Sequence, residues 1–152
     1  MYRRSIYTFW KRTVPPPSMM TFDAASRDLC SLKRPTTSTP LQALVMLNDP
    51  QILEASRVLA YRVVEKEKSV EDRIAMMFRL ATSRVIEKQE LDRLVEFFEE
   101  EKTRFTNTPK DAEALLQSGE YPQKEILEKP DLAALTLIAN TIFNLDETIT
   151  RG

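Results

Sequence analysis

Residues 39–50 read Thr39-Pro40-Leu41-Gln42-Ala43-Leu44-Val45-Met46-Leu47-Asn48-Asp49-Pro50 and contain two helix starts in succession. Thr39 before Pro40 is typical of an N-cap followed by a proline in the first helical turn, and Asp49 before Pro50 repeats this arrangement. Between the two starts, leucine and valine side chains supply the apolar face of a short helix. The stretch therefore predicts an αα-corner.

The residues that follow keep a helical pattern to the end of the chain. Apolar residues recur at helical spacing over 50–63, 70–81, 87–105 and 131–143. Thr108-Pro109 and Gly119 bound a shorter helix, and Ser69 with Asp72 has the spacing of a capping box. We predict an all-α fold, a compact bundle of about five or six helices with an extended Pro-rich N-terminal arm.

Residues 1–22 combine basic, aromatic and proline residues. Tyr2, Ile6, Phe9 and Trp10 fit a helical face, although residues 6–10 also have the composition of a strand, and we favour the helix. Pro15-Pro16-Pro17 predicts extended backbone that crosses a surface or groove as far as Phe22. We expect a basic-aromatic, Pro-rich arm over 1–22 and a helical domain over 23–152.

Composition excludes several classes of site. The 152 residues include no histidine, one cysteine and two glycines, Gly119 and Gly152. A histidine triad, a phosphate-binding glycine loop, an internal disulfide and a thiolate zinc cluster are therefore excluded. We expect no cofactor and no metal. The net charge of -1 gives no reason to expect a nucleic-acid partner. No apolar run reaches the roughly 18 residues of a membrane span, and Met1-Tyr2-Arg3-Arg4 does not resemble a signal peptide.

The arm carries the candidate binding residues. Four basic residues precede the first acidic one, with aromatic residues among them, a combination that suits sulfated or carboxylated sugars. The alternative, which we favour, is that the arm buries its aromatic rings and pairs its charges against an upstream domain. Asp146 and Glu147 are candidate ion-pair partners of the arm. The candidates for ligand or partner binding are Arg3, Arg4, Tyr7, Trp10, Lys11 and Arg12.

Asp23, Arg27 and Asp28 form the only candidate catalytic set. The two carboxylates, oriented by Arg27, could serve acid/base chemistry on a sugar bond or bind a cation. We favour the alternative, in which Asp23 caps a short helix over 24–30 and pairs with Arg27 one turn later. Cys30, near Lys33 and Arg34, is either a thiol of lowered pKa or, as we favour, a small buried apolar residue.

Several segments of the chain together resemble a known family, and these segments are Tyr2–Thr13, Phe22–Ala24, Arg27, Cys30, Thr39–Leu44, Leu47–Pro50, Asp131–Leu135 and Asn144–Glu147. This family is the C-terminal domain of large multidomain proteins abundant in planctomycetes and related bacteria, catalogued as domain of unknown function fifteen fifty-three. The chain differs from it at Ala25, where proline is more common, and at Ser83-Arg84-Val85, where Gly-Arg and Pro are more common. It also has no Cys-x-x-Cys-His haem site.

The resemblance implies an exported parent, periplasmic or secreted. In such parents a second domain of unknown function, and often a cytochrome c-like haem domain, precedes this region. Their genes often lie beside sulfatases, which suggests polysaccharide breakdown, but the family supplies no catalytic residues. We therefore expect the chain to be the terminal piece of such a parent, either cut from a larger protein or encoded alone.

In that setting we expect a non-catalytic accessory or interaction module that packs on the upstream domain and helps to bind anionic polysaccharide. The alternative is that Asp23, Arg27 and Asp28 contribute to a polysaccharide-degrading catalytic site completed elsewhere. Isolated from its partner, the chain could form a homodimer through an apolar patch that the partner normally covers.

Overall fold

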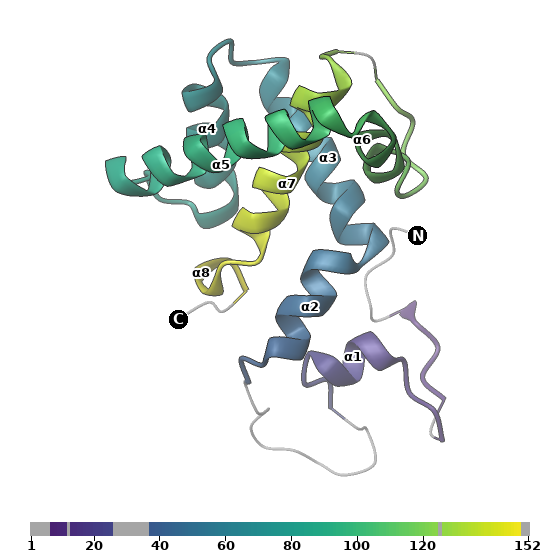
Figure 1. Ribbon diagram of the computed structural model, residues 1–152. Coiled ribbons are helices and arrows are strands. Elements are labelled where there is room, and N and C mark those ends of the chain that lie inside the picture. Colours follow the sequence, from purple (N-terminus) through teal and green to yellow (C-terminus); the bar gives the residue numbers. More distant parts are fainter. Residues whose placement is uncertain (1–6, 12, 26–36, 125, 150–152) are drawn as a thin grey trace. The chain divides into compact units, whose positions relative to one another are not determined.

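The computed structural model describes residues 7–11, 13–25, 37–124 and 126–149 (Figure 1). Within these ranges the chain forms helices and no strand, apart from a single bridge between Lys11 and Val14. The predicted all-α fold is confirmed. The helices are α1 (Pro17–Thr21), α2 (Pro40–Asn48), α3 (Pro50–Val64), α4 (Val70–Thr82), α5 (Lys88–Asn107), α6 (Pro109–Leu116), α7 (Lys129–Phe143) and α8 (Asp146–Ile149).

The chain divides into two compact units, residues 1–45 and residues 46–152. The smaller unit contains α1 and most of α2, and the larger unit contains α3 to α8. Every buried hydrophobic side chain of the described residues lies in the larger unit, between Leu59 and Ile142. Within the described part of the chain, the hydrophobic core therefore belongs to the larger unit.

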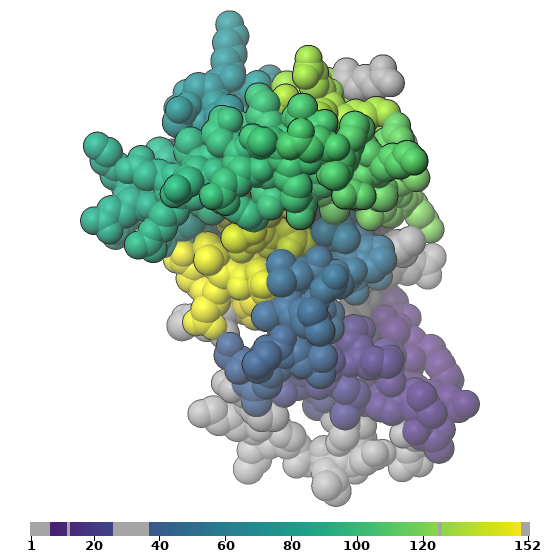
Figure 2. Space-filling model, in the orientation of Figure 1, coloured from purple at the N-terminus to yellow at the C-terminus, as the bar shows by residue number. Residues whose placement is uncertain are grey.

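Helix α7 is the centre of that core. Residues 132–136, 138–140 and 142 are all buried, so the helix is covered on every side, as expected for a helix that is apolar all round. Helices α3, α4, α5 and α6 pack against it, and Figures 1 and 2 show α5 lying across its first half. Three alanines (Ala133, Ala134 and Ala139) let these neighbours approach closely.

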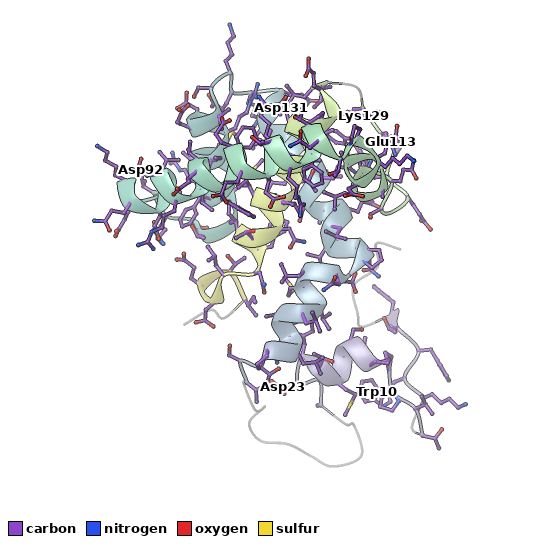
Figure 3. The ribbon with its side chains drawn as sticks, viewed as in Figure 1. Trp10, Asp23, Asp92, Glu113, Lys129 and Asp131 are labelled. Atoms are coloured by element: carbon purple, nitrogen blue, oxygen red, sulfur yellow. The ribbon has the colours of Figure 1, made fainter. Side chains whose placement is uncertain are left out.

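Ion pairs hold the beginning of α7 against two of these neighbours (Figure 3). Lys129 pairs with Glu113 of α6, and Asp131 pairs with Lys102 of α5 at 2.7 Å. Asp131 also lies in the first turn of α7, where a negative charge is favourable. The pairs thus help to position the central helix.

The predicted helix starts are found at the expected residues. The Asp49 side chain accepts a hydrogen bond from the Gln51 N–H at 2.8 Å, with Pro50 in the first turn of α3. Ser69 accepts from the Asp72 N–H at 3.1 Å and donates its hydroxyl proton to the Asp72 carboxylate at 2.7 Å. These contacts are local, which explains why sequence patterns could predict them.

The arm differs from our predictions in two places. Residues 7–11 are not α-helical, so the helix favoured for residues 2–12 is wrong in its described part. Pro17 does not continue the extended run of prolines but begins α1, because proline at the first helical position loses no hydrogen bond. None of the helices among the described residues is long and apolar enough to cross a membrane.

Candidate functional site

A polar cluster in the smaller unit links the end of α1 to the start of α2. Asp23 follows α1 with a φ of 54°, a left-handed conformation that Asp tolerates better than most residues. Its Oδ2 atom accepts hydrogen bonds from the Thr37 backbone N–H at 2.8 Å and from the Thr37 hydroxyl at 2.7 Å. The two bonds hold together residues that lie 14 positions apart in the sequence.

Gln42 of α2 completes the cluster and is 4% exposed. Its Nε2 donates to the Thr21 carbonyl at 2.8 Å and to the Thr37 hydroxyl oxygen at 3.0 Å. Its Oε1 accepts from the Thr39 N–H at 3.0 Å, while the Gln42 N–H donates to the Thr39 hydroxyl at 3.3 Å. This is a capping box. The Thr-Pro pattern predicted the Thr39 cap but not the role of Gln42. The Thr-x-x-Gln spacing of residues 39–42 is the sequence signature of a capping box and could have revealed it.

The cluster includes one of the three catalytic candidates. The hydrogen bonds from Thr37 stabilise the ionised Asp23 carboxylate and lower its pKa. A carboxyl with a lowered pKa is a poor proton donor and a weak base at neutral pH. Ala24 and Ala25 are not helical, and the rest of the predicted helix lies outside the described residues, as do Arg27, Asp28 and Cys30. The described contacts of Asp23 are those of a structural acceptor.

Three of the six candidate binding residues are described. Tyr7 is 75% exposed, Lys11 is exposed and Trp10 is partly buried. The Val14 N–H donates to the Lys11 carbonyl at 3.2 Å. Because Tyr7 and Lys11 are exposed, this part of the arm presents an aromatic ring and an amine to solvent. The remaining candidates, Arg3, Arg4 and Arg12, lie outside the described residues.

The smaller unit exposes many apolar side chains. Among its described residues the buried position belongs to the amide of Gln42, and no hydrophobic side chain is buried. This arrangement is the reverse of the larger unit, where apolar side chains fill the interior. The large hydrophobic residues exposed in the smaller unit are Tyr7, Phe9, Val14, Met20, Phe22, Leu41 and Leu44.

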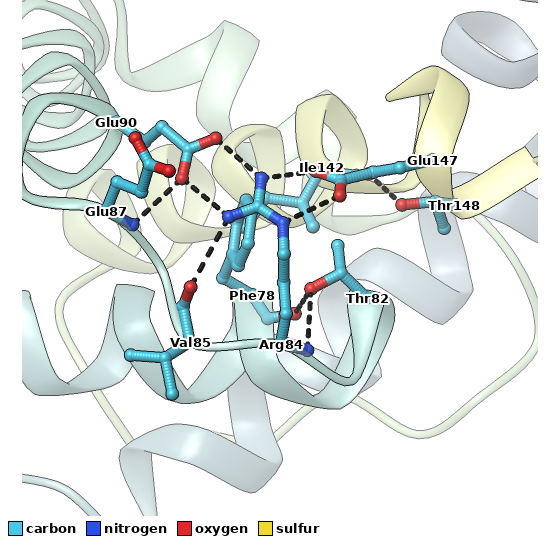
Figure 4. Close-up of polar contacts among 9 residues, drawn as sticks. All are labelled: Phe78, Thr82, Arg84, Val85, Glu87, Glu90, Ile142, Glu147 and Thr148. Atoms are coloured by element: carbon cyan, nitrogen blue, oxygen red, sulfur yellow. Dashed lines mark hydrogen bonds and ion pairs between the residues drawn. The ribbon is translucent and has the colours of Figure 1, made fainter.

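Arg84 is the main polar junction of the larger unit (Figure 4). Its Nε and Nη2 donate to the two carboxylate oxygens of Glu147 at 2.8 Å each. Its Nη1 and Nη2 donate to Glu90 at 2.8 and 2.6 Å, and Nη1 also donates to the Val85 carbonyl at 3.3 Å. All five N–H groups of the guanidinium are therefore used.

The guanidinium also lies over the Phe78 ring, 4.5 Å from its centroid. The Arg84 hydrogen bonds lower the pKa of Glu90 to about 2, and the two carboxylates raise the pKa of Arg84. Because every donor is occupied, this side chain joins the α4–α5 loop to α5 and α8 and has no donor left for a ligand. Glu147 thus pairs within the larger unit, whereas the sequence had suggested the arm.

A second polar junction holds the loop after α6. The Glu54 carboxylate of α3 accepts from the Glu120 N–H. The Arg57 Nη2 donates to the Tyr121 carbonyl at 2.9 Å and to the Ser118 carbonyl at 3.3 Å. Glu54 and Arg57 are each 1% exposed, so these bonds give partners to polar atoms that α3 carries into the interior, while the buried Arg57 Nε makes no hydrogen bond. The sequence pattern of α3 did not reveal this role.

A shallow groove lies along the outer face of α4. Its volume is about 660 Å³, and its apolar side chains include the exposed residues Leu80 and Val85. Glu67, Asp72 and Arg79 place charges of both signs beside them. Nothing in the arrangement selects one ligand chemistry, and in the described ranges no three Cys, His, Asp or Glu side chains could together hold a metal ion.

The comparison with known proteins identifies a family. One protein-family model matches residues 1–98 and is described as PSD1, Protein of unknown function (DUF1553). The chain belongs to this family. The match covers the whole smaller unit and continues into α5, so it includes Gln42, Arg84 and Glu90 and excludes Glu147. No curated protein and no solved structure matches the chain.

Proposed function

We propose that the chain is a non-catalytic interaction module of a larger exported protein. In this proposal the smaller unit packs on another domain of that parent, and the larger unit is the stable helical support that carries it. The observation behind the proposal is that, among the described residues of the smaller unit, the buried side chain is a glutamine amide and seven large hydrophobic side chains are exposed.

The exposed aromatic and aliphatic side chains of the arm would gain free energy on burial. Phe9 is 82% exposed, Tyr7 75% and Val14 65%. Burying one such side chain contributes roughly 1.5–3 kcal/mol. A unit that leaves them in water lacks the main driving force of folding, and a partner surface that covers them would supply it.

The catalytic alternative receives less support from the geometry. Asp23 is held by Thr37 in a state that favours the ionised carboxylate. A polysaccharide-degrading site needs a proton donor as well as a base or nucleophile. If the chain is catalytic, Asp23→Asn and Asp28→Asn should abolish turnover by the parent protein while it stays folded. An interaction module should keep both turnover and binding.

The exposed Tyr7 ring and the Lys11 amine favour a second candidate function, anionic-polysaccharide binding. We propose it as a contribution of the same arm, secondary to protein contact. Its test is the affinity for a sulfated glycan of the chain and of Trp10→Ala and Arg12→Ala variants. Unchanged affinity would remove this candidate.

A urea melt of the chain tests the main proposal. Trp10 is the only tryptophan, so its fluorescence reports on the arm, while circular dichroism at 222 nm reports chiefly on the helices of the larger unit. We expect one cooperative helical transition and a separate change in Trp10 emission at lower urea. Coincident transitions would show a self-sufficient smaller unit and contradict the proposal.

A matched control moves the fluorescent probe into the other unit. Phe143→Trp in a Trp10→Phe background places the single tryptophan at the end of α7, where the side chain is half-buried. Its fluorescence should follow the circular dichroism transition. This control shows that a separate Trp10 transition belongs to the arm and is not a general property of tryptophan in this chain.

A further inference from the structure

The two units carry opposite charges. Residues 1–45 contain seven Lys or Arg and two Asp or Glu, a net charge of +5. Residues 46–152 contain fifteen Lys or Arg and twenty-one Asp or Glu, a net charge of -6. The near-neutral total charge is therefore the sum of a basic unit and an acidic unit. Among the described residues, the basic unit exposes large hydrophobic side chains and buries none, whereas the acidic unit contains the buried hydrophobic core.

Charge and apolar exposure together restrict the partner. A net charge of +5 on a small unit repels basic surfaces and steers it towards acidic ones. The exposed residues include Val14, Met20 and Leu41 besides the aromatic ones. Sugars stack on aromatic rings, but aliphatic side chains need apolar hollows, which hydrated polysaccharides do not offer. The combination fits a protein surface in which acidic residues surround apolar hollows.

We propose that the smaller unit docks on an acidic protein surface with apolar hollows, using Tyr7, Phe9 and Val14 as anchors and its basic residues for steering. This inference rests on the proposed function and adds the chemistry of the partner. Interfaces of this kind bury aromatic anchors at the centre and keep charges at the rim. Lys11, exposed between Phe9 and Val14 in the sequence, has the position of such a rim charge.

The test uses the full chain and two labelled synthetic peptides, each an 18-residue amphipathic helix with a leucine face. One peptide has glutamate on its polar face, and its twin has lysine at the same positions. Binding is measured by fluorescence anisotropy. We expect the glutamate peptide to bind at least tenfold more tightly than its twin, and to weaken roughly tenfold between 50 and 300 mM NaCl. Equal binding of the two peptides would overturn the inference.

Variants locate the binding. Phe9→Ser should weaken binding of the glutamate peptide roughly tenfold, because one apolar anchor is lost, and Lys11→Glu roughly three- to tenfold. The matched controls are Val85→Ser, an exposed apolar residue of the larger unit, and Lys110→Glu, the same charge change in that unit. Neither control should weaken binding by more than about twofold. Equal effects in both units would overturn the assignment to the smaller unit.

Other partners give different results. Tight binding of heparin with no binding of either peptide would show that the partner of the smaller unit is an anionic glycan. Tight binding only to phosphatidylglycerol vesicles would show that the partner is a lipid surface. Each result would replace the acidic protein partner. Failure of the proposed function itself looks different, since coincident melting of both units with no effect of Phe9→Ser would show that the exposed side chains need no partner.

Discussion

Replacing Gly119 with alanine should destabilise the larger unit, for two separable reasons. Gly119 has a φ of 87°, in the region that favours glycine. An alanine in a left-handed conformation costs about 1–2 kcal/mol. The new Cβ atom would also lie 2.7 Å from the Glu54 Cβ and would overlap the Glu54 carboxylate. Both the backbone and the neighbouring side chain therefore oppose the substitution.

The second cost follows from the burial of Glu54, which is 1% exposed. To make room, its carboxylate has to leave the Glu120 N–H, so that buried polar groups lose their hydrogen bond. Leaving such a group unsatisfied costs about 1–3 kcal/mol. Together with the backbone cost, we expect Gly119→Ala to lower the free energy of unfolding by roughly 3 kcal/mol.

Urea denaturation followed at 222 nm measures this loss. With a slope of about 1.5 kcal/mol per molar urea, the midpoint should fall by about 2 M. A double-mutant cycle separates the two causes, because Glu54→Gly removes both the overlapping carboxylate and the Glu54 Cβ and leaves only the backbone cost. In that background Gly119→Ala should cost about half as much. Equal costs in both backgrounds, or a loss below about 1 kcal/mol, would refute the reasoning.

Two further predictions concern the junction around Arg84. Ser83 follows the last residue of α4 and has a φ of 65°, so Ser83→Gly should stabilise the chain by about 0.5 kcal/mol. Thr82→Gly, in the last turn of the helix, is the control and should destabilise the chain. A lower urea midpoint for Ser83→Gly would contradict this prediction. The pKa of Glu90 falls from 4.5 to about 2 on folding, so its contribution is complete above pH 4.5 and is lost as the pH falls towards 2. Because the Glu90 side chain is 35% exposed, we expect it to contribute only about 1 kcal/mol to the free energy of unfolding. The original chain should be more stable than Glu90→Gln by this amount at pH 6, and the difference should shrink by pH 2.5. A difference that stays constant with pH would argue against the ion pair.

Local signals made most of the helices predictable. Helix starts are recognisable because an N-cap and its hydrogen-bond partner lie within three residues of each other, as at Thr39-Pro40, Asp49-Pro50 and Ser69. The apolar period then predicts which side of each helix faces the core. In the arm, local sequence signals were not sufficient. Pro17 is compatible both with an extended run of prolines and with the first turn of a helix, and only the contacts of α1 distinguish these two conformations.

The polar junctions could not be predicted in the same way. Arg84 joins Glu90 and Glu147, which lie 6 and 63 residues away, and no local pattern connects the three. Arg57 appears in the sequence as a polar position of an amphipathic helix, yet it is buried against carbonyl groups of a loop 61 and 64 residues further on. Such pairings depend on tertiary packing, and a single sequence does not contain them.

The contrast between the units determines where a functional defect should appear. In the larger unit α7 is covered on all sides, so a substitution there acts on folding and reaches function through loss of the folded chain. In the smaller unit the exposed side chains contribute little to folding, so substituting Phe9 should leave the helical transition unchanged and alter association alone. A binding defect without a stability defect is therefore the signature of an interaction surface, and the smaller unit is where we expect to find it.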